Sequence, residues 1–234
     1  MTIDLNRLRK QNIIVPGDQR TSIAESFRRI KRPLLANVAA AEPGTAANLI
    51  MVTSPIENAG KTFCAVNLAI SMAMELDRTV MLVDADIVKQ AIPTVFGVKV
   101  GKGLMDCLLN RDLDLADVLF RTNIEKLSIL AAGTTHQNSA ELLASETMHM
   151  LLREMADRYR DRIVVFDSPP LLRSSEAAVL ASRMGQIVMV VEAWNTTGSE
   201  VKEALGRIES CSRISLILNK GEDPGSYSLG GHGA

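Results

Sequence analysis

Three consecutive residues, Gly60-Lys61-Thr62, have the types that bind phosphate and magnesium. They follow the apolar run 49–54 and precede an apolar helical segment, which is the strand–loop–helix context of a P-loop. Glycine lets the backbone approach a phosphate, a helix N-terminus attracts anions, lysine reaches the outer phosphates and threonine offers a hydroxyl to Mg²⁺. The expected phosphate-binding residues are Asn58, Ala59, Gly60, Lys61, Thr62 and Phe63.

The loop departs from the strict P-loop pattern. Pro55 stands where a glycine is usual, and Glu57 and Asn58 occupy positions that small residues often hold. Asparagine tolerates a left-handed backbone better than most residues, so the loop can still fold, while Glu57 places a carboxylate near the phosphates. The alternative is an ordinary strand-to-helix turn with a solvated lysine.

Asp84 is the last residue of the apolar run 79–84, and Asp86 follows it two residues later. Their i, i+2 spacing points both side chains the same way. Such a pair can hold Mg²⁺ or its waters, or accept a proton. The alternative is a helix N-cap followed by a solvated acid.

A third acid, Asp167, ends the apolar run 163–167 in the arrangement of a Walker B motif. Together the three acids and the lysine loop predict a nucleotide site, with Thr62, Asp84 and Asp167 at the metal and Lys61, Asp84 and Asp86 as catalytic groups. Asn219, which ends the last apolar run, could hydrogen-bond adenine or could be a turn residue.

The elements that position these residues alternate along the chain. Short apolar runs alternate with helical segments, and nearly all-apolar runs are typical of strands covered on both faces. This pattern predicts an α/β fold with a doubly wound, mainly parallel sheet of about six to eight strands and helices on both faces. The runs are 49–54, 79–84, 127–131, 163–167, 186–191 and 214–219, and the helical segments are 61–76, 139–159, 175–184 and 199–210.

Composition favours one large domain. Of 234 residues, 47% are hydrophobic and 3% aromatic, and the net charge of −1 argues against nucleic acid as a partner. The cysteines Cys64, Cys107 and Cys211 lack metal-ligand spacing and are expected to be reduced thiols. We find no signal peptide and no bilayer-length apolar run, so we expect a soluble, cytoplasmic protein.

Outside the predicted sheet, Ser22 and Glu25 have capping-box spacing and open a helix that Pro33 should kink or divide. The stretch 36–47 is expected to be a linker. We divide the chain into a loosely held N-terminal arm (1–20), a basic helix and linker (21–47), a P-loop domain (48–221) and a flexible Gly-rich tail (222–234).

These residues resemble a known family. The segments Glu25-Ser-Phe-Arg28-Arg-Ile-Lys31-Arg32-Pro33, Gly60-Lys61-Thr62, Val83-Asp84-Ala85-Asp86, Asn138-Ser-Ala-Glu141, Asp167-Ser-Pro-Pro170 and Leu218-Asn219-Lys220 are similar to those of bacterial tyrosine kinases of capsule and exopolysaccharide synthesis. The closest likeness is to exosortase-associated tyrosine autokinases, which are related to the MinD/ParA group of P-loop ATPases.

The resemblance implies ATP and Mg²⁺ as cofactors and transfer of the γ-phosphoryl group to a tyrosine in a neighbouring subunit's tail, here Tyr227. It also implies self-association through a helix, with a membrane polysaccharide co-polymerase as activator at the inner face of the plasma membrane. The implied subunit-contact residues are Glu25, Arg28, Lys31 and Arg32.

Two other functions stay open. The altered loop at Glu57 and Asn58, together with a single tail tyrosine, fits an adaptor that keeps the fold without turnover. A MinD/ParA-like ATPase switch is the other, although the stretch Pro55-Ile56-Glu57 lacks the extra lysine usual in that group.

Overall fold

A seven-stranded sheet with the order β3-β4-β2-β5-β1-β6-β7 forms the centre of the computed structural model, which describes residues 1–18, 20–42, 44–110, 112–158, 162–208 and 210–221. All strand pairs are parallel except β3 with β4. The expected α/β fold is therefore confirmed. The strands are β1 (Leu49–Thr53), β2 (Thr79–Asp84), β3 (Leu119–Arg121), β4 (Leu127–Leu130), β5 (Arg162–Asp167), β6 (Gln186–Glu192) and β7 (Ile214–Asn219).

Six of these strands coincide, within about a residue at each end, with the apolar runs of the sequence. The central strands β1, β2 and β5 are buried along nearly their whole length, because helices cover both faces of the sheet. The sequence pattern missed β3, a three-residue antiparallel edge strand that is too short to show a period.

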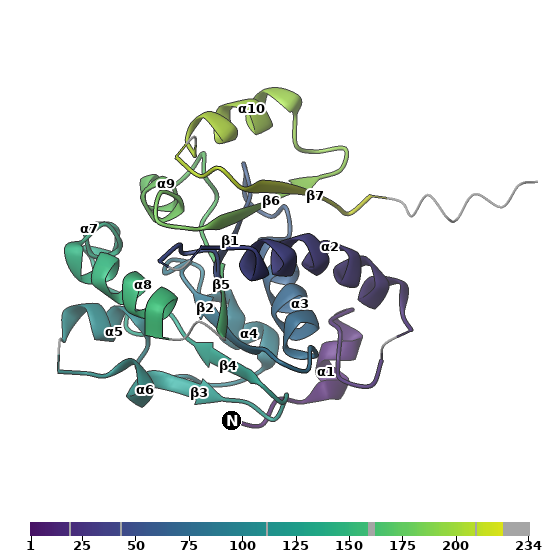
Figure 1. The fold of residues 1–234 in the computed structure, drawn as a ribbon, viewed down its shortest axis with the longest axis horizontal. Helices are drawn as coiled ribbons and strands as arrows, with labels where there is room; N and C mark the ends of the chain where they lie inside the picture. The colour runs from purple at the N-terminus through teal and green to yellow at the C-terminus, as the bar shows by residue number, and fades with distance from the viewer. Residues whose placement is uncertain (19, 43, 111, 159–161, 209, 222–234) are drawn as a thin grey trace, which may run out of the picture.

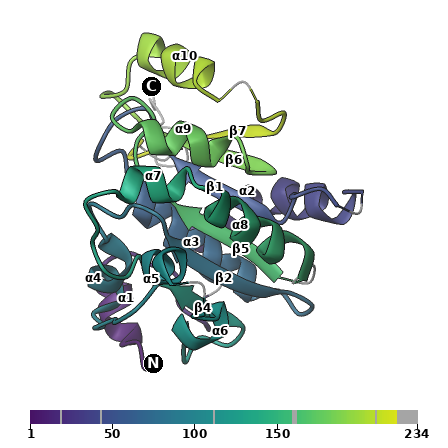
Figure 2. The same cartoon turned by 90° about the vertical axis from the view of Figure 1, so that its left-hand side faces the viewer.

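Two helical layers enclose the sheet (Figures 1 and 2). One apolar core joins the sheet to α1, α2, α3 and α4, and a second joins the opposite face to α5 through α10. The helices are α1 (Leu5–Lys10), α2 (Ser22–Ala39), α3 (Lys61–Ala73), α4 (Ala91–Phe96), α5 (Leu104–Leu109), α6 (Leu115–Val118), α7 (Ser139–Leu143), α8 (Glu146–Arg158), α9 (Ser175–Ala181) and α10 (Gly198–Gly206).

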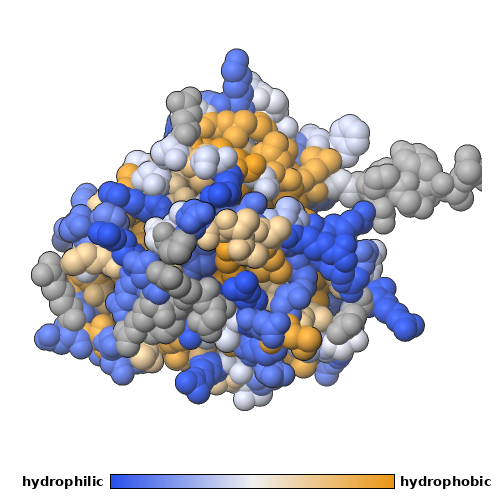
Figure 3. Space-filling view, viewed as in Figure 1, coloured by the Kyte–Doolittle hydropathy of each residue, from blue (hydrophilic) through white to orange (hydrophobic). Residues whose placement is uncertain are grey.

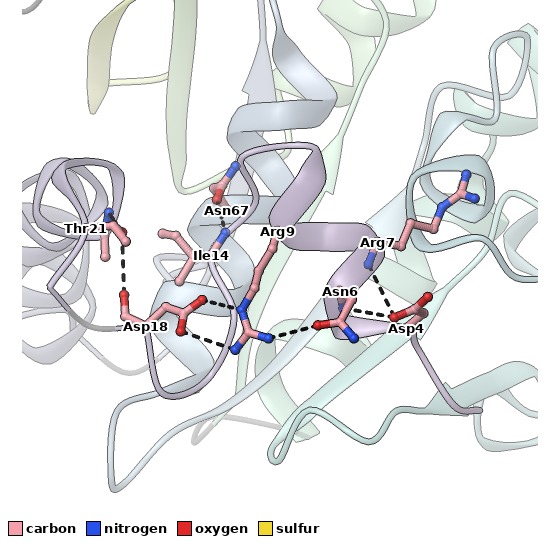
Figure 4. A network of polar contacts seen from close by, with 9 residues as sticks. Asp4, Asn6, Arg7, Arg9, Ile14, Asp18, Thr21 and Asn67 are labelled. Carbon is pink, nitrogen blue, oxygen red and sulfur yellow. Dashed lines mark hydrogen bonds and ion pairs between the residues drawn. The ribbon is translucent and has the colours of Figure 1, made fainter.

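The N-terminal segment is not the loosely held arm that its polar composition predicts. It forms α1 and then an apolar stretch, in which Leu8 and Val15 are fully buried. The Ile14 N–H donates to Asn67 Oδ1 of α3 at 2.9 Å, and Arg9 pairs with Asp18 at 2.6 Å (Figure 4). The sequence interpretation was wrong because a few apolar residues, spaced too widely for a clear period, anchor the segment.

Helix α2 also differs from expectation. Its N-cap is Thr21, whose hydroxyl accepts the Ala24 N–H, so the cap lies one residue before the predicted Ser22. Pro33 does not divide the helix: it lies exposed within one continuous helix, in which Phe27 and Leu34 are buried. The helix therefore continues to Ala39 and shortens the predicted linker.

The predicted helix over 139–159 is two helices, α7 and α8. The break follows Leu143, and the Ser145 hydroxyl accepts the Met148 N–H at the start of α8. The three cysteines are buried and unbridged, as expected. In the described part of the chain, no helix is long and apolar enough to span a membrane.

The outer strand β7 leaves apolar side chains uncovered beside α10. Leu216 is 56% exposed and Leu218 is 69% exposed. Figure 3 shows an apolar area of the surface over β6 and β7. Parallel strands end at one edge of the sheet, and the carboxyl ends of β1, β2, β5, β6 and β7 bring the predicted site residues together there.

Candidate functional site

The loop between β1 and α3 has the backbone of a phosphate-binding turn. Asn58 and Gly60 both adopt positive φ angles, 61° and 98°, as the sequence analysis allows for asparagine. Gly60 is the N-cap of α3, so the free N–H groups of the helix face the same space. A Cβ atom at Gly60 would collide with the side-chain amide of Asn219, so a glycine is required there.

The ends of β6 and β7 hold this loop from the side. Asn219 Nδ2 donates to the Ala59 carbonyl at 2.8 Å. Lys220 Nζ donates to the Asn58 carbonyl at 2.9 Å and pairs with Glu192 at 2.7 Å. The Asn219 amide, for which the sequence left open an adenine contact or a turn, thus donates to the phosphate loop.

Lys61 begins α3 and is 5% exposed. Burial lowers the pKa of its ammonium group, and the nearby carboxylates Asp167 and Asp86 act in the opposite direction. The side chain is therefore held among acids at the carboxyl edge of the sheet, where a phosphate chain could share its charge.

Asp84 and Asp167 lie side by side, because β2 and β5 are neighbours and their register pairs these two residues. Both are fully buried. Burial and, after it, the adjacent Asp167 together raise the pKa of Asp84 to about 8. Burial likewise raises the pKa of Asp167 to about 7, against the Thr62 hydroxyl and Lys61, which lower it.

These carboxylates are not fully paired. Asp84 Oδ2 accepts the Ile92 N–H at 3.2 Å. Among the described residues, Asp84 Oδ1 and both oxygens of Asp167 have no hydrogen-bond partner. The Thr62 hydroxyl lies near Asp167 and lowers its pKa, but the two groups do not meet hydrogen-bond geometry. Buried carboxylate oxygens without a donor fit a site that a cation completes.

Asp86 follows the end of β2 and is 6% exposed. Its Oδ1 atom accepts the Lys89 N–H at 3.1 Å, which fixes the turn after the strand. The carboxylate is close enough to act on the charge of Lys61. Asp86 therefore has both of the roles that the sequence left open. It accepts a hydrogen bond in the turn after β2, and its charge acts on Lys61 of the phosphate loop.

The donor set fits Mg²⁺ better than a metal held by protein ligands alone. No group of three or more His, Cys, Asp or Glu side chains with metal-binding geometry occurs in the described ranges. Mg²⁺ is usually held by one or two carboxylates, waters and substrate phosphates. Asp167 and Thr62, with Asp84 beside them, could supply that protein share.

The predicted residues outside this edge have other surroundings. Phe63 is half-buried and packs edge-on against Phe27, with ring centroids 6.3 Å apart. Lys31 is not displayed on the surface: it is buried, and its ammonium group bonds the Ser71 carbonyl at 2.5 Å and Glu75 at 2.7 Å. Tyr227 lies outside the described residues.

The rest of the basic helix is more open. Glu25 and Arg32 are exposed, and Arg28 contacts Glu25 one turn away. Of the four predicted subunit-contact residues, the structure brings three to the surface of α2 and keeps Lys31 inside.

Three basic residues at this edge, Lys89, Arg173 and Lys220, are not among the predicted site residues. Lys89 Nζ donates to Asn58 Oδ1 at 3.3 Å, and Arg173 lines a cleft that also contains Lys61 and Asp86. The cations lie after strand ends, but surface lysines and arginines are common, so no spacing pattern distinguished them.

Known proteins have sequences similar to this chain. A family model described as an AAA domain matches residues 49–216. The putative tyrosine-protein kinase EpsB of Ralstonia nicotianae is 32% identical over 184 residues, 78% of this chain and 24% of EpsB. The putative tyrosine-protein kinase CapB of Staphylococcus aureus is 27% identical over 210 residues, 89% of each chain. The chain thus spans about a quarter of EpsB and most of CapB.

Solved structures of several proteins have folds similar to this chain. The kinase domain of Escherichia coli tyrosine kinase ETK superposes with a TM-score of 0.79 at 27% identity, covering 92% of this chain and 81% of that one. The chimerical protein CapA2B2 gives 0.78 at 26% identity, with 95% and 93% covered. The MinD protein of Pyrococcus horikoshii, solved with Mg-ADP, gives 0.59 at 23% identity, with 73% and 69% covered, and shares the fold alone.

The model match covers most of the chain and includes the phosphate loop and both strand-end acids. The chain belongs to the AAA domain family, and its relatives there are bacterial tyrosine-protein kinases.

Proposed function

We propose that the chain is an ATP-dependent protein-tyrosine autokinase that regulates exopolysaccharide synthesis or export. One observation carries the proposal: two adjacent buried carboxylates, Asp84 and Asp167, with unpaired oxygens beside the lysine of a phosphate loop. The kinship with tyrosine kinases then selects tyrosine as the acceptor.

In this reaction the phenolic oxygen of a tail tyrosine forms a bond to the γ-phosphorus of ATP. The bond from that phosphorus to the bridging oxygen breaks, and ADP leaves with its electron pair. The phenol, whose ordinary pKa is about 10, gives its proton to Asp86 or Asp84. Catalysis is mostly positioning and charge neutralisation, with Lys61 against the outer phosphates.

Mg²⁺ would be held by Thr62 and Asp167, with Asp84 beside them, and would neutralise charge on the phosphates. The protein's own contribution is to fix these groups. Thr53 Oγ1 donates to the Pro169 carbonyl at 2.9 Å and Ser168 Oγ to the Val52 carbonyl at 3.0 Å, which join the ends of β1 and β5. The phosphate loop and the acids are therefore held at fixed separation.

The acceptor in this proposal is Tyr227 of a neighbouring subunit. Self-association would bring one subunit's tail to another's site, and a membrane polysaccharide co-polymerase would activate the kinase. Such a partner would recruit the chain from the cytoplasm to the inner face of the plasma membrane. The structural likeness to CapA2B2, a chimera, is compatible with a partner segment acting on this fold.

The test is phosphorylation of the full chain with ATP and Mg²⁺, with and without the cytoplasmic segment of a co-polymerase. Intact mass should rise by one phosphate, mapped to Tyr227. Lys61→Ala should abolish the gain, because the outer phosphates lose their cation, and Tyr227→Phe should abolish it with ATP binding intact. No added phosphate in any mixture would sink the proposal.

A non-catalytic adaptor is the second candidate. The carboxylate of Glu57 lines the same cleft as Lys61 and would repel a triphosphate. Calorimetry separates the two, since a chain that does not bind ATP favours the adaptor. Phosphate release without phosphotyrosine would instead favour an ATPase switch.

A further inference from the structure

A cleft of about 370 Å³ opens beside the phosphate loop, between the exit of β2 and the turn after β5. Its volume lies in the range of small-ligand pockets, about 300–1,000 Å³. Lys61 and Asp86 line it, and so does Arg173. The cleft therefore contains both the groups assigned to the chemistry and a cation that the chemistry does not use.

Three apolar residues form part of the lining of this cleft. Val88 is 88% exposed, although the residues before it are buried, and Pro169 and Pro170 line the cleft with it. An exposed valine beside two prolines offers a surface on which an aromatic ring can pack. A tyrosine ring lying there would share the cleft with Asp86, one of the two predicted proton acceptors.

The guanidinium group of Arg173 can bind a further carboxylate. Arg173 is exposed, and within the described ranges its guanidinium group makes no hydrogen bond or ion pair. It is near enough to Glu200 to contribute to lowering the pKa of that carboxyl, but Glu200 is itself bonded to Thr197. An arginine can take a carboxylate through two parallel hydrogen bonds.

The other charged side chains of the cleft have partners or act on the phosphate loop, and Glu57 and Asp86 both act on the charge of Lys61. Glu176 accepts the Ser174 hydroxyl at 2.7 Å and the Ser175 hydroxyl at 3.4 Å. Lys89 bonds Asn58 of the phosphate loop and acts on the charge of Lys61, so it faces the phosphate side. Arg173 is left as the cation open to a peptide.

We propose that this cleft binds the acceptor tyrosine and that Arg173 selects acceptors with acidic residues ahead of the tyrosine. The proposal rests on the kinase function above and deepens it. The chain's own tail has this pattern, since Glu222 and Asp223 precede Tyr227. Three residues separate Asp223 from Tyr227, and these four Cα steps can reach about 13 Å, enough to cross a cleft of this size.

The test measures binding, which does not require turnover. A fluorescent peptide with the sequence of residues 221–232 is titrated with the full chain, Mg²⁺ and a non-hydrolysable ATP analogue. A matched peptide carries Glu222→Gln and Asp223→Asn. We expect the acidic peptide to bind about fivefold more tightly, the scale of one rim charge pair.

Arg173→Gln should remove this preference and leave the neutral peptide unchanged. Arg213→Ala is the matched control, because Arg213 is an exposed arginine just before β7, at the opposite edge of the sheet, and should keep the preference. Val88→Ser should weaken both peptides equally. Equal affinities for the two peptides, no binding of either, or a preference that survives Arg173→Gln would overturn the inference.

The kinase proposal fails by a different result. It fails if the full chain forms no phosphotyrosine, whatever peptide it binds. The acceptor inference fails on the affinities alone, even if Tyr227 is phosphorylated.

Discussion

Asp84 is a carboxylate in a place where a charge is costly. It is fully buried, has one backbone donor, and lies beside a second buried acid. Burial and that neighbour raise its pKa to about 8, so without a cation much of it holds a proton at neutral pH. A bound cation would therefore stabilise this site. Without a metal, the buried acid lowers the stability of the folded protein.

This cost predicts a pH dependence in EDTA. The pKa of Asp84 rises from about 3.9 in the unfolded chain to about 8 in the folded one. The folded state therefore holds the extra proton, and the stability that Asp84 contributes is fully present below about pH 4 and is lost as pH rises through 8. Asp84→Asn, which keeps an acceptor for the Ile92 N–H, should make this fall smaller, the remainder being due to Asp167, and add about 2 kcal/mol at pH 8.

Urea denaturation at pH 6 and pH 8 measures this effect. Mg²⁺ with ATP should stabilise the wild-type chain and not Asp84→Asn to the same degree, because the amide carries no charge for the metal to neutralise. A variant that is less stable than wild type at pH 8 without metal would contradict the account of Asp84 as an uncompensated acid.

Helix α2 is attached to the P-loop layer through a buried cation. Lys31 reaches from α2 to the end of α3, where it bonds the Ser71 carbonyl and Glu75. Its partner Glu75 is still 43% exposed, so the pair lies at the boundary of the core. The bond joins α2, the helix that presents Glu25 and Arg32, to the end of α3.

Lys31→Met should lower the free energy of unfolding by about 2 kcal/mol. Methionine keeps the apolar stem but leaves the Ser71 carbonyl without its donor. Arg32→Ala, the exposed neighbour, should change stability by less than about 0.5 kcal/mol. The measurement is urea denaturation, and equal effects of the two substitutions would show that Lys31 does not anchor the helix.

The elements show what a single sequence can predict. Six strands could be predicted because a strand covered on both faces needs an apolar run, whichever helices cover it. The anchored N-terminal segment could not be predicted, because no local apolar period marks it. Leu8 and Val15 are buried through contacts with distant parts of the chain. Lys31 was misplaced for the same reason, because nothing local distinguishes a lysine that faces Glu75 from one that faces water.

The acids of the site were predictable for a topological reason. Asp84 and Asp167 each end an apolar strand, and parallel strands end at one edge, so their proximity follows from the fold. The role of Asn219 in holding Ala59 did not follow, because it depends on the separation of β7 from the phosphate loop. Strand ends predict which residues meet, and side-chain geometry decides what each one does.

At the scale of the whole molecule, α2 presents a charged face to solvent next to the P-loop layer. Glu25, Arg29 and Arg32 are exposed on it, and Lys31 is withdrawn to Glu75. A face that carries both an acid and arginines can pair with a second copy in which the charges alternate. Self-association of the chain, if it uses this helix, must therefore depend on Glu25 and the exposed arginines and not on Lys31.

Sedimentation velocity over a range of concentrations tests this assignment. Glu25→Arg places like charge among the arginines and should weaken association about tenfold. Lys31→Met should leave the association constant of the folded chain unchanged, and so should the remote Arg213→Ala. Because the contact is exposed and charged, raising the salt from 0.05 to about 0.5 M should weaken it too. A salt-insensitive oligomer that survives Glu25→Arg would place the subunit contact on another surface, and the uncovered leucines of β7 would be the next to substitute.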